Sequence, residues 1–179
     1  EQFKKATDNS VKDHRMDAQE SALRFMYFYD QYNEDNVLGD YLGNMDSALD
    51  EYVEKINRQT NFQNYISSYL QSLSDAFSLF GKYAFRKVYT EYENSRRNQV
   101  NKLLMMTICV LLAKYRDSYK NGIEQKKDLT PALARLIKND SVFFNAITWS
   151  TNSKANMKYV FEKIKKDLFD YNLIENEQS

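Results

Sequence analysis

The sequence predicts an all-α fold, a single-domain bundle of about seven helices around a central buried helix at about residues 98–118. Apolar residues recur at helical spacing in most segments, and no stretch shows the period of two that a half-buried strand requires. Helix breakers are scarce, with one Pro and four Gly in 179 residues. The 14 Tyr and 11 Phe argue against disorder, so we expect one sizeable core.

The segment LLMMTICVLLA at 103–113 contains no charge, Gly or Pro. Apolar residues lie on every side of this helix, so we expect it to be buried all round. Eleven residues are too few to cross a bilayer, which needs about 20 apolar residues, so a central core helix is predicted and no membrane contact. Cys109, the single Cys, lies within the run, which excludes a disulfide within the chain and indicates a reducing, cytoplasmic location.

The other helices are expected at 17–32, 45–58, 62–80, 131–140, 141–150 and 153–172. Asp17, Asn61 and Ser153 are typical N-cap residues for three of them. Gly81 is expected to end the helix at 62–80, and Pro131 is tolerated at a first helical position. The segments 33–44 and 121–131 are expected to be loops.

Polar composition at both ends predicts the domain limits. Residues 1–16 are expected to lead in from a missing upstream domain, because the opening is polar and does not begin with Met. Residues 17–171 form the expected helical domain, and residues 172–179 a polar tail.

The formal net charge is zero but unevenly distributed. Residues 1–60 contain 13 acidic and 7 basic residues, a net charge of −6, whereas residues 61–138 contain 6 acidic and 13 basic residues, a net charge of +7. Such asymmetry steers an anionic partner toward the middle third, or lets the two parts of one molecule attract each other.

A basic and aromatic segment at 82–102 is the one candidate binding site. Lys and Arg neutralise phosphates, and Tyr stacks on unpaired bases. The candidate nucleic-acid-binding residues, five bases within seventeen residues, are Arg86, Lys87, Arg96, Arg97 and Lys102. Two alternatives stay open. In the first, the aromatic side chains belong to the core and the charged groups are solvated. In the second, Arg86 pairs with an acid of the first sixty residues.

Motifs for catalysis, metals and cofactors are absent from the sequence. His14 is the only His and Cys109 the only Cys, too few for a zinc site. Neither G-x-x-x-x-G-K-[ST] nor G-x-G-x-x-G occurs, so no phosphate-binding loop is indicated. We therefore expect no catalytic residue, no metal and no cofactor, and no enzyme activity in this chain alone.

A family resemblance rests on five sequence blocks. In chain order they are HRMDAQESALRFMYFYDQY, YLGNMDSALDEY, FGKYAFRK, VNKLLMMTICVLL and FFNAITWSTNSKANMKYVFEKI. Together they resemble the helical carboxy-terminal region of a bacterial family whose amino-terminal domain has a ParB-like, sulfiredoxin fold, as in GmrSD-type Type IV restriction systems. The matching positions are Arg15, Asp17, Arg24, Phe25, Phe80, Gly81, Phe85, Arg86, Phe144, Ala146, Thr151 and Ser153.

The resemblance implies an accessory or interaction module of a multidomain restriction-like or anti-phage protein, with weak nucleic-acid contact. The whole protein would then be an NTP-dependent nuclease component, but the family's nucleotide-processing motifs lie in the preceding domain. The implied partners are the upstream domain of the same protein, DNA and a partner subunit. The alternative function is a protein–protein interaction scaffold without a nucleic-acid role.

Overall fold

The computed structural model describes residues 2–7, 17–58, 62–88 and 99–174. In these ranges the only strand-like feature is an isolated antiparallel bridge between Arg86 and Val100, so the predicted all-α fold is confirmed. The α-helices are α1 (Gln2–Ala6), α2 (Asp17–Gln31), α3 (Met45–Ile56), α4 (Phe62–Phe80), α5 (Lys102–Lys114), α6 (Arg116–Glu124), α7 (Thr130–Asn139), α8 (Ser141–Ala146), α9 (Lys154–Lys163) and α10 (Tyr171–Leu173). A 3₁₀-helix, η2 (Gly81–Tyr83), follows α4, and a π-helix, η3 (Ile164–Asp170), joins α9 to α10.

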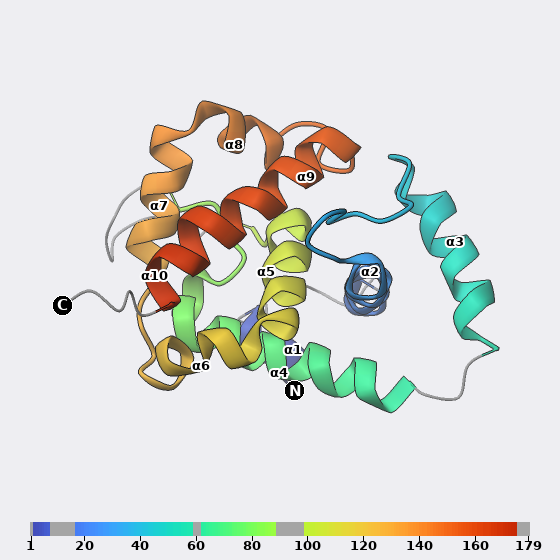
Figure 1. Cartoon of the computed structure of the whole chain (residues 1–179), viewed down its shortest axis with the longest axis horizontal. Coiled ribbons are helices and arrows are strands. Elements are labelled where there is room, and N and C mark those ends of the chain that lie inside the picture. The colour runs from blue at the N-terminus through green and yellow to red at the C-terminus, as the bar shows by residue number, and fades with distance from the viewer. Residues whose placement is uncertain (1, 8–16, 59–61, 89–98, 175–179) are drawn as a thin grey trace.

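Helix α5 is buried on every side. Ten consecutive residues, from Leu103 to Leu112, are buried. Helices α2, α4 and α9 and the π-helix η3 all pack against it, and it stands in the middle of the molecule in Figure 1. Because each fully buried large aliphatic side chain contributes roughly 1.5–3 kcal/mol, this one helix is a large part of the hydrophobic stabilisation. The predicted central helix is therefore confirmed.

The ends of the central helix differ from the prediction of 98–118. Helix α5 begins later, because the Asn101 side chain caps it by accepting a hydrogen bond from the Leu104 amide at 3.0 Å, while Val100 is bridged to Arg86. It ends at Lys114, since Tyr115 leaves the helical backbone angles (φ −115°, ψ 22°) and the chain turns into α6. Residues 121–124, which were expected to be in a loop, belong to α6.

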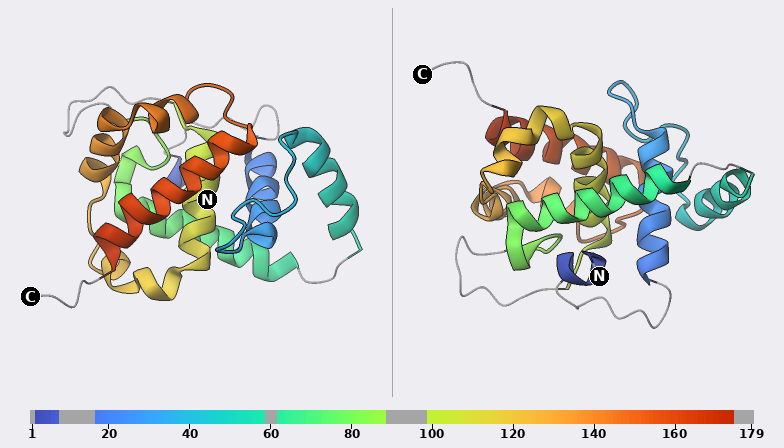
Figure 2. Two further views of the ribbon diagram at one scale, coloured as in Figure 1. Left: turned by 45° about the horizontal axis from the view of Figure 1, so that its top comes forward. Right: turned by 90° about the horizontal axis from the view of Figure 1, so that it is seen from below.

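Asp30 joins three helices at the edge of the molecule. It accepts hydrogen bonds from Tyr52 of α3 at 2.7 Å and from Tyr65 of α4 at 2.6 Å. The hydrogen bond to Asp30 is the largest cause that raises the pKa of Tyr65, to about 12, so this hydroxyl stays a donor at neutral pH. Helix α3 packs on α2, and it stands apart from the rest of the molecule in Figures 1 and 2.

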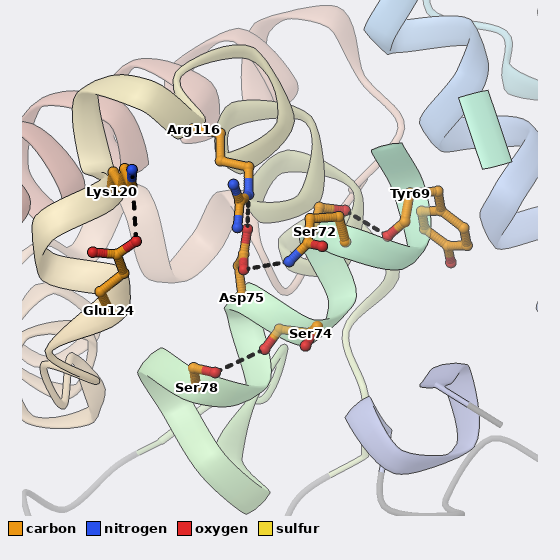
Figure 3. A network of polar contacts seen from close by, with 9 residues as sticks. Tyr69, Ser72, Ser74, Asp75, Ser78, Arg116, Lys120 and Glu124 are labelled. Carbon is orange, nitrogen blue, oxygen red and sulfur yellow. Dashed lines mark hydrogen bonds and ion pairs between the residues drawn. The ribbon is translucent and has the colours of Figure 1, made fainter. Parts of the chain in front are cut away.

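A buried carboxylate, Asp75, ties α4 to α6 (Figure 3). Its two oxygens accept from the Gln71 amide and from the Arg116 guanidinium, both at 2.9 Å. Asp75 is 3% exposed, and a carboxylate that deep is tolerated only when it is paired and hydrogen-bonded. The cluster therefore stabilises the contact between the two helices.

The helical fold extends beyond the predicted limits of 17 and 171. Helix α1 packs on α4, and Ala6 and Thr7 are buried, although residues 1–16 were expected to be a polar lead-in. Leu173, in the expected tail, is buried too. No helix among the described residues has the length and apolar character needed to cross a membrane.

Several predicted helix boundaries are confirmed. The Ser153 side chain caps α9 by accepting from the Asn156 amide, and Gly81 follows α4 with φ +52°. Helix α7 begins at Thr130 with Pro131 in its first turn. The Asp17 side chain and the whole of Asn61, both expected to form caps, lie outside the described part of the structure.

We predict that Leu104→Asp prevents folding, because an unpaired charge in a packed core costs several kcal/mol, a large part of a total stability of roughly 5–15 kcal/mol. Helicity by circular dichroism and the urea midpoint measure the effect. Leu42→Asp is the matched control, since Leu42 is 89% exposed and Leu104 is 0% exposed. Equal midpoints for the two variants would show that the burial of α5 is not what holds the fold.

Candidate functional site

Arg86, one of the predicted nucleic-acid-binding residues, is buried. It is 1% exposed, and its guanidinium donates to the Thr7 carbonyl at 2.8 Å and to the Lys82 carbonyl at 3.0 Å. The preceding Phe85 has φ +64° and is buried as well. The prediction that Arg86 faces a nucleic acid is therefore wrong, because this side chain holds the end of α1 inside the molecule.

Lys87 and Asn101, the residue before Lys102, both contact the segment 147–148. The Lys87 ammonium lies 3.4 Å from the Thr148 hydroxyl, and the Asn101 amide beside Lys102 donates to the Ile147 carbonyl at 2.6 Å. These contacts place Lys87 and the start of α5 beside the segment 147–148. Arg96 and Arg97 lie outside the described residues.

The charge of Lys102 is partly neutralised by an acid from another helix. Its ammonium lies 2.9 Å from Glu20 of α2, which also pairs with Arg24 at 2.7 Å. Burial acts to raise the pKa of Glu20, but the hydrogen bonds and charges of Lys102 and Arg24 outweigh it and lower that pKa. This arrangement leaves less positive charge for phosphates than the sequence suggests.

A groove between α2, α3 and the loop that joins them is the better candidate site. Its volume is about 450 Å³, within the range of ligand-binding hollows. Charged, aromatic and apolar side chains line it, among them Tyr27, Asp40, Leu42, Glu51, Tyr52 and Lys55. They come from three separate segments of the chain.

The loop is held in place by Gly39 and Tyr41. A Cβ at Gly39 would lie 2.1 Å from the Gln31 amide oxygen, and the backbone there has φ +54°, so only glycine fits. The same Gln31 oxygen accepts from the Asp40 amide at 3.2 Å. Tyr41 is fully buried and donates to the Asn152 carbonyl at 2.6 Å, while Leu42 beside it is 89% exposed at the groove.

Three polar groups of the groove lack partners among the residues that the structure describes. The side-chain oxygens of Asp40 and Glu51 form no ion pair or hydrogen bond there, and neither does the hydroxyl of Tyr27. Tyr27 is only 7% exposed, and burial, followed by the charges of Asp40 and Glu51, raises its pKa. The groove therefore combines negative charge with a neutral hydroxyl at the end of an otherwise buried side chain.

Two other polar clusters in the described part are closed, in that their groups satisfy one another. The Tyr115 hydroxyl donates to Glu34 at 2.7 Å. The Tyr119 hydroxyl donates to Asp170 at 2.7 Å, and Lys165 pairs with the same carboxylate at 2.9 Å. Such clusters hold helices together.

Within the described ranges, no group of three or more His, Cys, Asp or Glu is placed to hold a metal ion. Cys109 is 0% exposed, and burial raises the pKa of its thiol to about 12. A neutral, covered thiol is not a nucleophile at physiological pH.

Sequence reasoning missed the groove. Gly39 marks the loop, and acids are abundant in the first sixty residues, but nothing local shows that Tyr27, Asp40 and Glu51 converge. Tyr27 and Glu51 lie within ordinary amphipathic helices, where an apolar or charged residue is the expected pattern.

Comparison with known proteins gives no match: no family model fits the chain, and no curated protein or solved structure is significantly similar to it. The resemblance to the restriction-type family therefore stays a prediction.

We predict that Arg86→Met lowers the free energy of unfolding by about 1–3 kcal/mol, because it leaves the carbonyls of Thr7 and Lys82 without their donor. The same change at the next residue, Lys87→Met, should lower it by less than about 0.5 kcal/mol, as expected for a residue nearer the surface. Urea denaturation of both variants measures the difference. Equal effects would contradict a structural role for the buried guanidinium.

Proposed function

We propose that this chain is a helical interaction module that binds a partner polypeptide in the groove between α2 and α3. The observation that carries the proposal is a hollow of about 450 Å³ with unpartnered polar groups and an adjoining Leu42 that is 89% exposed. An exposed large apolar side chain beside a concave surface is typical of protein interfaces, where one anchor residue enters a hollow and polar groups fix its orientation.

The position of α3 supports this proposal. The helix packs on α2 through Tyr52, Leu49 and Met45, and its other side faces outward. An extended or helical segment laid along the groove would contact α2, α3 and the loop together, which is the helix-in-groove arrangement of peptide recognition.

The wider setting of the module rests on the sequence resemblance alone. It would be an accessory part of a multidomain bacterial restriction-like or anti-phage defence protein, and the bound polypeptide would be the upstream domain of that protein or a partner subunit. A cytoplasmic location belongs to the same proposal, since the single Cys is a free thiol. No catalytic role is proposed for the chain.

Weak nucleic-acid contact is the second candidate function. Lys87 and Lys102 favour it, because Lys87 contacts the Thr148 hydroxyl and Lys102 is exposed at the start of α5. Arg96 and Arg97 are the other cations proposed for this surface, and Arg86 is removed from the set because it is buried.

We predict that a displayed library of random twelve-residue peptides yields binders to this chain whose affinity falls at least about tenfold on Ala48→Trp, which fills the groove. Val142→Trp is the matched control, since it introduces the same side chain at an exposed position on α8. Dissociation constants by fluorescence anisotropy measure the effect. The proposal fails if no peptide is enriched, or if every enriched peptide binds Ala48→Trp as tightly as the parent.

For the second candidate, we predict weak binding of labelled single- or double-stranded DNA that decreases as salt rises, with a slope set by the few phosphates contacted. Lys87→Glu/Lys102→Glu and Arg96→Glu/Arg97→Glu should each reduce it, as titrations at two salt concentrations would measure. If both double variants are folded and bind like the parent, this surface is not a nucleic-acid site.

A further inference from the structure

We propose that the α2–α3 groove recognises a basic segment of its partner, with one arginine side chain held between Asp40, Glu51 and the Tyr27 hydroxyl. This inference rests on the proposed function and names the chemistry of the bound polypeptide. An arginine fits better than a lysine, because its planar guanidinium presents several donors at once and stacks on an aromatic ring.

Asp40 and Glu51 supply the charge. One lies on the loop and the other on α3, and both line the groove. Neither has an ion-pair partner within the described residues, although Glu51 and Lys55 are spaced i, i+4 on one helix. A guanidinium between them would form charge-assisted hydrogen bonds, which are about twice as strong as neutral ones.

The Tyr27 hydroxyl is a second feature of the groove, independent of the acids. The side chain is only 7% exposed, and its hydroxyl oxygen is the part that the groove leaves accessible, with no hydrogen-bond partner within the described residues. Burial and the two nearby carboxylates keep the phenol protonated. Its oxygen can accept an N–H from a guanidinium while its proton points to a carboxylate.

Tyr52 lines the groove with a ring that is only 3% exposed and that already lies next to a cation. The Lys55 ammonium lies 6.0 Å from the centroid of the Tyr52 ring, at the upper end of the distance for a cation–π contact. Tyr27 packs edge-on against the same ring, with centroids 5.5 Å apart and planes at 89°. An incoming arginine would compete with Lys55 for this ring and be repelled by its charge.

The surrounding surface carries the charge that a basic segment needs. Helix α3 exposes Asp46, Asp50 and Glu54 in addition to Glu51, and none of them has an ion-pair partner in the described ranges. Like charges gathered on one outlying helix steer a cationic partner to it and raise the association rate at low salt.

The test uses three labelled heptapeptides, Gly-Leu-Gly-Xaa-Gly-Leu-Gly, with arginine, citrulline or lysine at the centre. Citrulline has the shape of arginine without its charge. Fluorescence anisotropy at low salt should show the arginine peptide bound at least about tenfold more tightly than the citrulline peptide, and the lysine peptide between them. Asp40→Asn/Glu51→Gln should abolish the difference between arginine and citrulline, and Tyr27→Phe should weaken arginine binding several-fold.

Lys55→Gln is the decisive variant, because it should tighten binding of the arginine peptide by about two- to fivefold by removing the competing cation. A misfolded protein cannot produce this gain. Circular dichroism of each variant confirms that the helices are intact.

The outcomes separate this inference from the proposed function. If library-selected peptides bind in the groove but arginine and citrulline peptides bind equally, the arginine site is wrong and the interaction module stands. If the arginine peptide binds Ala48→Trp as tightly as the parent, it binds elsewhere and the inference fails. If neither the library nor the arginine peptide yields binding, both proposals fail.

Discussion

The requirement that α5 be covered on every side determines how the other helices are arranged. A helix with ten consecutive buried residues needs apolar neighbours all round, and α2, α4, α9 and η3 provide them. Their apolar faces are used for this purpose, so α3 is left with α2 as its main support and is attached by Tyr52 and its apolar stripe. The groove is thus a consequence of the packing: α3 adds its buried stripe to the core on one side only, and the space beside it stays open.

Burial also explains why the acids of the groove lack protein partners within the described residues, whereas other acids have them. Asp75 lies deep in the fold, where an unpaired carboxylate would cost several kcal/mol, and it has two partners. Asp30 accepts from two tyrosines that fix the edge helices. Asp40 and Glu51 are exposed enough for water to satisfy them, so folding does not require a partner for either and the groove keeps its negative charge.

The sequence predicts those features that depend on local pattern. The uncharged run at 103–113 and the Ser153 cap depend on neighbours within a few residues, and both predictions are confirmed. The burial of Arg86 depends on the Thr7 carbonyl, 79 residues away, and the bend at Tyr115 has no Gly or Pro to mark it. The groove requires Tyr27, Asp40 and Glu51 to meet through tertiary packing, and no spacing rule connects them.

The uneven charge along the chain has one of the two roles that the sequence allows, attraction within the molecule. The Glu20–Lys102 pair joins the acidic first third to the basic middle third within one molecule, although exposed pairs of this kind contribute only about 0–1 kcal/mol. The acids of α3 are not used in this way, because α3 packs on α2 and its exposed side meets no basic helix. Internal attraction therefore neutralises the charge near α5 but leaves it uncompensated on α3, where the Tyr27 hydroxyl also lacks a partner. A cation supplied from outside the described residues would satisfy both.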